Sequence, residues 1–188
     1  MITLPTPRIA PITPAEWTDA TRDVFEIMGG AEARLKGSPY NVVLTLAHHP
    51  ELAIPHLNFY KVMLSCSTLS LPLRELITLR VAWRTQSEYE WIQHVKLGKR
   101  VGLTDEHIEA IKIGPESPLW TELERLSIRA VDQLFVQSQI DDATWQGLSQ
   151  HMNKKELIEL LFIIGTYTML CWAFNAMGVK LEQATSGE

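Results

Sequence analysis

The sequence contains few cysteines and little excess charge of either sign, and each shortage excludes a class of protein. Its 188 residues include two cysteines, Cys66 and Cys171, which lie far apart and form no CxxC motif. Neither a local zinc site nor a vicinal redox pair is therefore encoded, and we expect no metal. The formal net charge of −5 provides no basic surface for phosphates, so no nucleic-acid partner is expected.

Signals for secretion and for the membrane are also weak. The stretch MITLPTPRIAPITP contains four prolines and no apolar core, so it is unlike a signal peptide and we expect a cytoplasmic protein. Residues 160–177 carry no formal charge and are about as long as the shortest membrane-spanning helices. Thr166, Thr168 and Asn175 interrupt this run. We therefore expect it to be the central helix of a bundle or part of a subunit interface, with no membrane partner.

Helix-start and helix-stop signals recur along the chain and predict an all-α fold. Thr13, Pro14 and Glu16 are the elements of a capping box, so a helix is expected from there to about residue 28, ending at Gly29 and Gly30. Apolar spacing and caps predict further helices over residues 41–47, 50–64, 70–85, 86–101, 104–111, 119–135, 141–151 and 153–178.

The two halves of the chain resemble each other. A shift of 81 positions places RELITL at 74–79 on KELIEL at 155–160, and it aligns Glu90 with Cys171 and His94 with Asn175. We interpret residues 1–188 as one domain with an internal duplication. The first repeat covers about 38–113, the second, degenerate repeat covers about 119–180, and an N-terminal arm and helix cover 1–37. The ionisable residues survive in the first repeat.

The stretch SEYEWIQH, residues 87–94, concentrates reactive side chains. Glu90 and His94 are four residues apart, so they share one face of a helix, and Ser87 lies one turn earlier on that face. A carboxylate beside an imidazole orients the ring and favours its protonated form, which suits proton transfer near neutral pH. The same spacing also describes an ordinary solvated ion pair on a helix surface. Spacing alone leaves both interpretations open.

A family resemblance favours the reactive interpretation. The segment RELITLRVAW followed by SEYEWIQHVKLGKRVGLTDEHIEAI resembles the carboxymuconolactone decarboxylase and alkyl hydroperoxidase D superfamily, and AHHPEL at 47–52 is also typical. The resemblance spans roughly residues 15–182 and implies a helical bundle of the alkyl hydroperoxidase D-like type. The family motif has a glutamate, then two reactive positions, then a histidine. Glu75, Ser87, Glu90 and His94 hold those places here.

The reactive positions distinguish the two branches of this superfamily. The hydroperoxidase branch has two cysteines where this chain has Ser87 and Glu90, and neither of these side chains can form a sulfenic acid. Peroxidase activity is thus disfavoured unless Cys66 or Cys171 substitutes. The sequence EYEW at 88–91 is similar to the decarboxylase branch. The resemblance therefore implies a lyase of aromatic-compound catabolism that decarboxylates a small unsaturated lactone without a cofactor. A peroxidase and a non-catalytic ligand-binding oligomer remain as alternatives.

Catalytic roles follow from this resemblance. His94 is expected to donate the proton, Glu90 to orient or share it, and Glu75 to polarise a water or the imidazole. Arg80 and Arg84, one turn apart, are expected to hold a substrate carboxylate as a clamp, although two such arginines are also commonly solvated or paired.

Further residues are assigned to substrate binding. Tyr89 and Trp91 are expected in the core or in the wall of a pocket, His49 at its rim, and Asn175 facing the site from its own subunit or a neighbour. Ser87 is expected to donate a hydrogen bond to the substrate or to Glu90. The family also implies a homo-oligomer, with a trimer favoured and a hexamer as the second arrangement.

Overall fold

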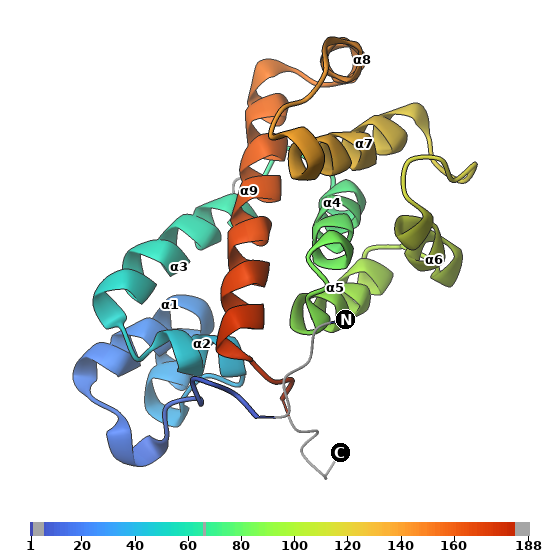
Figure 1. Cartoon of the computed structure of the whole chain (residues 1–188). Helices are drawn as coiled ribbons and strands as arrows, with labels where there is room; N and C mark the ends of the chain where they lie inside the picture. The colour runs from blue at the N-terminus through green and yellow to red at the C-terminus, as the bar shows by residue number, and fades with distance from the viewer. Residues whose placement is uncertain (2–5, 66, 183–188) are drawn as a thin grey trace. The chain divides into compact units, whose positions relative to one another are not determined.

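The computed structural model describes residue 1, residues 6–65 and residues 67–182, and the regular elements in these ranges are helices (Figure 1). The predicted all-α fold is confirmed. A 3-10 turn, η1 (Pro14–Glu16), is followed by α1 (Asp19–Lys36), α2 (Asn41–Leu46), α3 (Pro50–Ser65), α4 (Leu71–Arg84), α5 (Glu88–Arg100), α6 (Asp105–Ile113), α7 (Glu122–Gln137), α8 (Asp142–His151) and α9 (Lys154–Met177).

The chain divides into two compact units. The first contains Met1 and Ser67–Asn175, and the second contains residues 6–65 and 176–182. The boundaries between the two units do not coincide with the boundaries of the predicted repeats, 38–113 and 119–180. The internal duplication therefore stays a prediction, and the candidate site lies in the first unit.

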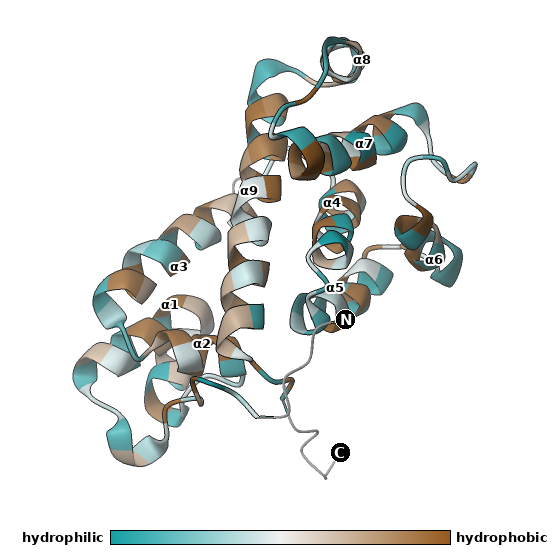
Figure 2. Ribbon diagram, in the orientation of Figure 1, coloured by the Kyte–Doolittle hydropathy of each residue, from teal (hydrophilic) through white to brown (hydrophobic). Residues whose placement is uncertain are grey.

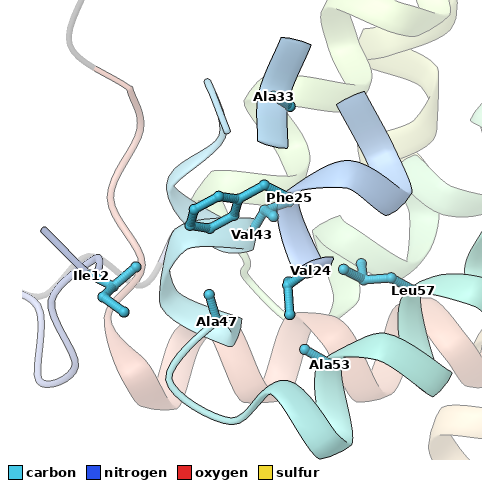
Figure 3. Packing of buried hydrophobic residues seen from close by; sticks show 8 residues of the cluster. All are labelled: Ile12, Val24, Phe25, Ala33, Val43, Ala47, Ala53 and Leu57. Carbon is cyan, nitrogen blue, oxygen red and sulfur yellow. The ribbon is translucent and has the colours of Figure 1, made fainter. Parts of the chain in front are cut away.

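The second unit is built from α1, α2 and α3 around a small apolar core. Side chains from these helices and from the N-terminal arm point toward one another in Figure 3. The buried members are Ile12, Val24, Phe25, Ala33, Val43, Ala47, Ala53 and Leu57.

The first helix begins later than expected. The capping box of Thr13 is present but opens only the short turn η1, and α1 begins later, after a second capping box at Thr18. Gly30 interrupts α1 with a non-helical φ of 66°, which places a kink where the first helix was expected to end. A second helical segment follows the kink and ends at Gly37.

In the first unit, α4 is the most deeply enclosed helix. Every residue from Leu73 to Ala82 is buried, including Glu75 and Arg80, and α4 packs against α5, α6 and α7. Leu76 and Leu79 join the main apolar cluster of the unit with Leu103, Ile108, Ala110, Ile111, Trp120 and Ile128. A helix enclosed on all sides by protein can hold charged side chains away from water, where their mutual interactions are strong.

Helix α9, which contains the uncharged run 160–177, is buried on one side and exposed on the other. It is therefore not enclosed all round as a central helix would be, and its expected part in a subunit interface stays a prediction. One side packs inside the first unit through residues such as Leu160 and Cys171, whereas Ile158 and Trp172 are exposed. Most of α9 is pale or brown in Figure 2, the colours of neutral and apolar residues. By length and composition α9 is able to cross a membrane, but half of its apolar window is buried inside the protein.

Candidate proton-transfer site

A tight turn between α4 and α5 sets the geometry of the site. The amide of Ser87 donates to the carbonyl of Ala82 at 3.0 Å, and the amide of Gln86 donates to that of Trp83 at 3.2 Å. This pair of bonds is a Schellman motif, in which the residue after the cap is left-handed. That residue is Gln86, with φ of 56°, although glycine is preferred there. The turn sends α5 back alongside α4 and brings Glu90 and His94 next to Glu75.

The imidazole of His94 lies between two carboxylates. Its Nδ1 is 2.7 Å from Oε2 of Glu75 on α4. Its Nε2 is 3.1 Å from Oε2 of Glu90, which lies on α5 together with His94. All three side chains are buried. Because ionised carboxylates accept hydrogen bonds but do not donate them, a ring protonated at both nitrogens satisfies both contacts, whereas a neutral ring satisfies only one.

These contacts decide the charge of the ring. Burial is the largest single influence and lowers the pKa of His94, but the hydrogen bonds and charges of Glu75 and Glu90 together raise it from 6.5 to about 9. His94 is therefore mainly an imidazolium at neutral pH. Because the ring is buried and contacts a carboxylate at each nitrogen, it is held in one orientation and carries a proton that it can donate.

Tyr167 and Cys171 of α9 border the cluster. The ring of Tyr167 meets that of His94 edge to face, with centroids 5.0 Å apart. The Cys171 thiol is fully buried, and this burial, followed by the charge of Glu90, raises the pKa of the thiol to about 12. A thiol that stays protonated at neutral pH is a poor nucleophile. Cys66, the other expected candidate for thiol chemistry, lies outside the described residues.

Ser87 has an unsatisfied hydroxyl. It is the N-cap residue of α5, yet its side chain makes no capping hydrogen bond. Its Oγ is fully buried and meets no hydrogen-bond criterion, although it lies close enough to the Cys171 thiol to lower the pKa of that thiol, against the larger effect of burial. An unsatisfied buried hydroxyl costs stability, which makes Ser87 a candidate donor to a bound molecule.

The two arginines of the expected clamp are paired with a carboxylate of the protein, the alternative that was also expected for them. Both oxygens of Asp132 on α7 accept from Arg80, at 2.9 and 2.7 Å, and the carbonyl of Ile111 accepts from it at 2.6 Å. The guanidinium of Arg80 therefore makes its hydrogen bonds inside the protein, where it joins α4 to α6 and α7. Arg84 lies 3.6 Å from the same aspartate, with its guanidinium over the ring of Phe135. The two arginines meet around an internal carboxylate.

The remaining predicted substrate contacts have other neighbours. Tyr89 is buried edge to face against Phe174, and Trp91 is half-buried beside Trp83, with ring centroids 5.4 Å apart. Both aromatic side chains therefore serve packing, one of the two roles expected for them.

Asn175 and His49 are also engaged in other contacts. Asn175 donates its amide to the carbonyl of Thr85 at 2.9 Å, so it fastens α9 to the end of α4 instead of facing the histidine. His49 belongs to the second unit, where its exposed ring lies 3.3 Å from Glu51. In the described part of the chain, no three His, Cys, Asp or Glu side chains are grouped to hold a metal.

Sequence reasoning missed Tyr167, Asp132 and the position of Cys171. Tyr167 and Asp132 carry no local signal, because each reaches its partner through the packing of helices far apart in the sequence. Cys171 did carry one signal, since the 81-residue shift aligns it with Glu90, the residue whose charge it feels.

Comparisons with known proteins identify a family and a fold. Residues 50–133, which contain the whole cluster, match the model of the carboxymuconolactone decarboxylase family. Three similar structures share 18–20% identity with the chain, so they establish the fold. None of the curated proteins matches the sequence significantly.

Two of these structures cover almost the whole chain. One is a peroxidase-related protein from Ralstonia eutropha with an alkylhydroperoxidase AhpD core, which covers 92% of both chains with a TM-score of 0.74. Another is the debrominase Bmp8, which covers 94% of this chain and 92% of its own with a TM-score of 0.72. A protein of unknown function from Agrobacterium tumefaciens, named as a candidate antioxidant defence protein AhpD, covers 72% of this chain and 93% of its own, with a TM-score of 0.66.

Proposed function

Because the chain belongs to the carboxymuconolactone decarboxylase and alkyl hydroperoxidase D superfamily, we propose that it is a cytoplasmic acid–base enzyme that works without a cofactor. Its substrate class is a small unsaturated lactone or ring that carries a carboxylate, and its reaction is decarboxylation or a related proton transfer. The observation that carries the proposal is the buried imidazole of His94, which contacts a carboxylate at each nitrogen. A purely structural ion pair does not require a second carboxylate at such a site, and burying the extra charge is costly.

The reaction balances with groups that the chain supplies. The bond between the ring carbon and its carboxylate breaks, and the electron pair spreads onto the conjugated carbonyl as a dienolate while carbon dioxide leaves. One proton then bonds to a carbon of the dienolate. His94 is the source of this proton, and a proton from water restores the imidazolium before the next turnover.

The two carboxylates have different parts in this step. Glu75 makes the shorter contact with His94, 2.7 Å, and keeps the ring oriented and charged. Glu90 makes the longer contact, 3.1 Å, and lies one turn beyond the unsatisfied hydroxyl of Ser87. The proton therefore passes to the substrate along the Glu90 side of the ring. Ser87 donates a hydrogen bond to the carbonyl oxygen on which the negative charge develops.

The peroxidase alternative requires a reactive thiol, and the described cysteine is unsuited to that role. Burial and the charge of Glu90 raise the pKa of Cys171 to about 12, which suppresses the thiolate that attacks a peroxide. The non-catalytic alternative requires a bound ligand but no proton transfer. Removal of the His94 imidazole abolishes turnover only if the protein is an enzyme, so this change separates the two alternatives.

The test is a substrate panel of carboxylated unsaturated lactones and related acids, scored for release of carbon dioxide. Wild-type protein is expected to turn over at least one member, and His94→Gln to lose about 100-fold or more of that rate while its fold persists. His151→Gln is the matched control, because His151 is exposed on α8. No turnover of any panel member, or equal rates for wild type and His94→Gln, would count against the proposal.

A further inference from the structure

The turn that carries Ser87 contains a left-handed residue that is not glycine. Gln86 has a φ of 56°, a conformation that costs free energy for any residue with a Cβ atom. The turn between α5 and α6 closes with the same pair of hydrogen bonds, one of them from the amide of Leu103 to the carbonyl of Gly98 at 2.9 Å. Its left-handed residue is Gly102, with a φ of 103°. The turn before α5 therefore adopts at a cost the conformation that the turn after α5 adopts freely.

Ser87 does not fix its own position. The side chain of an N-cap residue ordinarily accepts a hydrogen bond from an amide in the first turn of its helix. The caps of α6 and α8, Thr104 and Asp141, both accept such a bond, whereas Ser87 accepts none. The direction of the Ser87 hydroxyl therefore depends on the backbone of the turn and on the side chains that pack against it.

One face of α9 packs against this turn. Asn175 donates from Nδ2 to the carbonyl of Thr85 at 2.9 Å. Cys171 lies one turn earlier on the same face of α9, and its buried thiol is close to the side chains of Thr85 and Ser87. The two residues of α9 thus contact both neighbours of Gln86.

We propose that Asn175 is a positioning residue for Ser87. The carbonyl of Thr85 and the nitrogen of Gln86 belong to one rigid, planar peptide. A hydrogen bond that holds this carbonyl restrains rotation about the N–Cα bond of Gln86, which is the rotation that its left-handed φ describes. Ser87 follows directly in the chain, so its hydroxyl is held in a fixed direction.

The importance of this restraint for catalysis rests on the function proposed above, in which Ser87 donates to the oxygen that becomes negative. A donor stabilises such a charge most when it is oriented before the reaction begins. A Ser87 that moved with a loose turn would have to be reoriented in every turnover. Asn175 therefore acts on the reaction through Ser87, without touching the substrate.

Amide hydrogen exchange tests the positioning without a substrate. Asn175→Asp is nearly isosteric but has no donor for the carbonyl of Thr85. It is expected to speed exchange of the Ser87 amide, which donates to Ala82 at 3.0 Å, by about 10-fold or more. The amide of Leu103 in the turn after α5 is expected to exchange at its wild-type rate. Asn175→Ala provides the same comparison if the aspartate prevents folding.

Gln137→Ala is the matched control. The side chain of Gln137 on α7 also donates to a backbone carbonyl, that of Gln139 at 3.1 Å, within the same unit. Its loss is expected to leave exchange at Ser87 unchanged. Unchanged exchange at Ser87 in the Asn175 variants, or equal acceleration at Ser87 and Leu103, would overturn the proposal, because the second result describes a general loss of stability.

A double-mutant cycle on a substrate found in the panel tests the route through Ser87. Ser87→Ala is expected to lower kcat by about 100-fold with a smaller change in KM, because its bond forms in the transition state. Asn175→Ala is expected to lower kcat by about 10-fold alone, but by less than about 2-fold when Ser87 is already alanine.

The two proposals fail in different ways in this cycle. Equal effects of Asn175→Ala with and without the Ser87 hydroxyl would overturn the positioning role and leave the role of Ser87 intact. A kcat that is indifferent to Ser87→Ala would refute the role of Ser87 in the proposed function. In that case the exchange rates of the Ser87 and Leu103 amides still decide whether Asn175 positions the turn.

Discussion

Replacing Glu75 with glutamine removes the carboxylate nearest to His94 and changes the charge of the ring. In the wild type, the rise of the His94 pKa from 6.5 to about 9 corresponds to about 3 kcal/mol, at about 1.4 kcal/mol for each pKa unit. A carboxylate within 3 Å typically accounts for roughly 1–3 pKa units. Glu75→Gln is therefore expected to lower the pKa of His94 by roughly 1–3 units, toward or below neutrality.

The same pKa makes the stability of the folded chain depend on pH. Because the folded pKa of His94 lies above the unfolded value, its stabilisation is complete below about pH 6.5 and is lost as the pH rises through about 9. The free energy of unfolding of the wild type is therefore expected to fall by about 3 kcal/mol over that interval. Cys171 acts in a separate window, because its raised pKa removes stability only between about pH 9 and 12. Glu75→Gln is expected to reduce the loss between pH 6.5 and 9.

Nitrogen chemical shifts of the imidazole, followed from pH 5 to 10, measure the pKa directly, and the resonances that disappear in His94→Gln identify the ring. Urea unfolding at a series of pH values measures the stability. Glu106→Gln is the control, because Glu106 is an exposed acid on α6. A ring that titrates near 6.5 in wild type and variant alike would refute the reasoning about the two carboxylates.

Three further predictions concern the surroundings of the site. Asp132→Ala is expected to lower the free energy of unfolding by about 3 kcal/mol, because it leaves the buried Arg80 unpaired, whereas Arg84→Ala should cost less than about 1 kcal/mol; urea denaturation compares them. Cys171→Ala is expected to keep the turnover of the wild type, and thiol alkylation should not inhibit the enzyme; loss of activity in either assay would favour the peroxidase alternative. Gln86→Gly is expected to raise the free energy of unfolding by about 1 kcal/mol, because glycine adopts the left-handed turn without strain, and an unchanged or lower thermal midpoint would contradict this.

Local signals in the sequence predicted most of the fold. The threonine cap at Thr104 and the asparagine cap at Asn153 open α6 and α9 where expected, since a cap acts on amides within one turn of itself. The start of the first helix was misplaced because the capping box at Thr13 opens only the turn η1, whereas a second capping box at Thr18 opens α1. The kink at Gly30 lies where two adjacent glycines were expected to end that helix.

The contacts of the site differ in how far the sequence alone could predict them. The pair of Glu90 and His94 follows from helical spacing, because residues four apart meet on one face. The contact of His94 with Glu75 was expected only from the family resemblance. The bond of Arg80 to Asp132, 52 residues away, and that of Asn175 to Thr85, 90 residues away, depend on how whole helices pack, so side chains expected at the substrate were found holding the fold together.

Solvent isotope incorporation tests the central claim most directly, namely that His94 supplies a proton to carbon. Once a substrate is found, turnover in deuterium oxide by the wild type is predicted to place one deuterium on a carbon of the former dienolate. His94→Gln is predicted to release carbon dioxide about 100-fold more slowly or worse. Product that carries deuterium at the same rate with and without the imidazole would contradict the account.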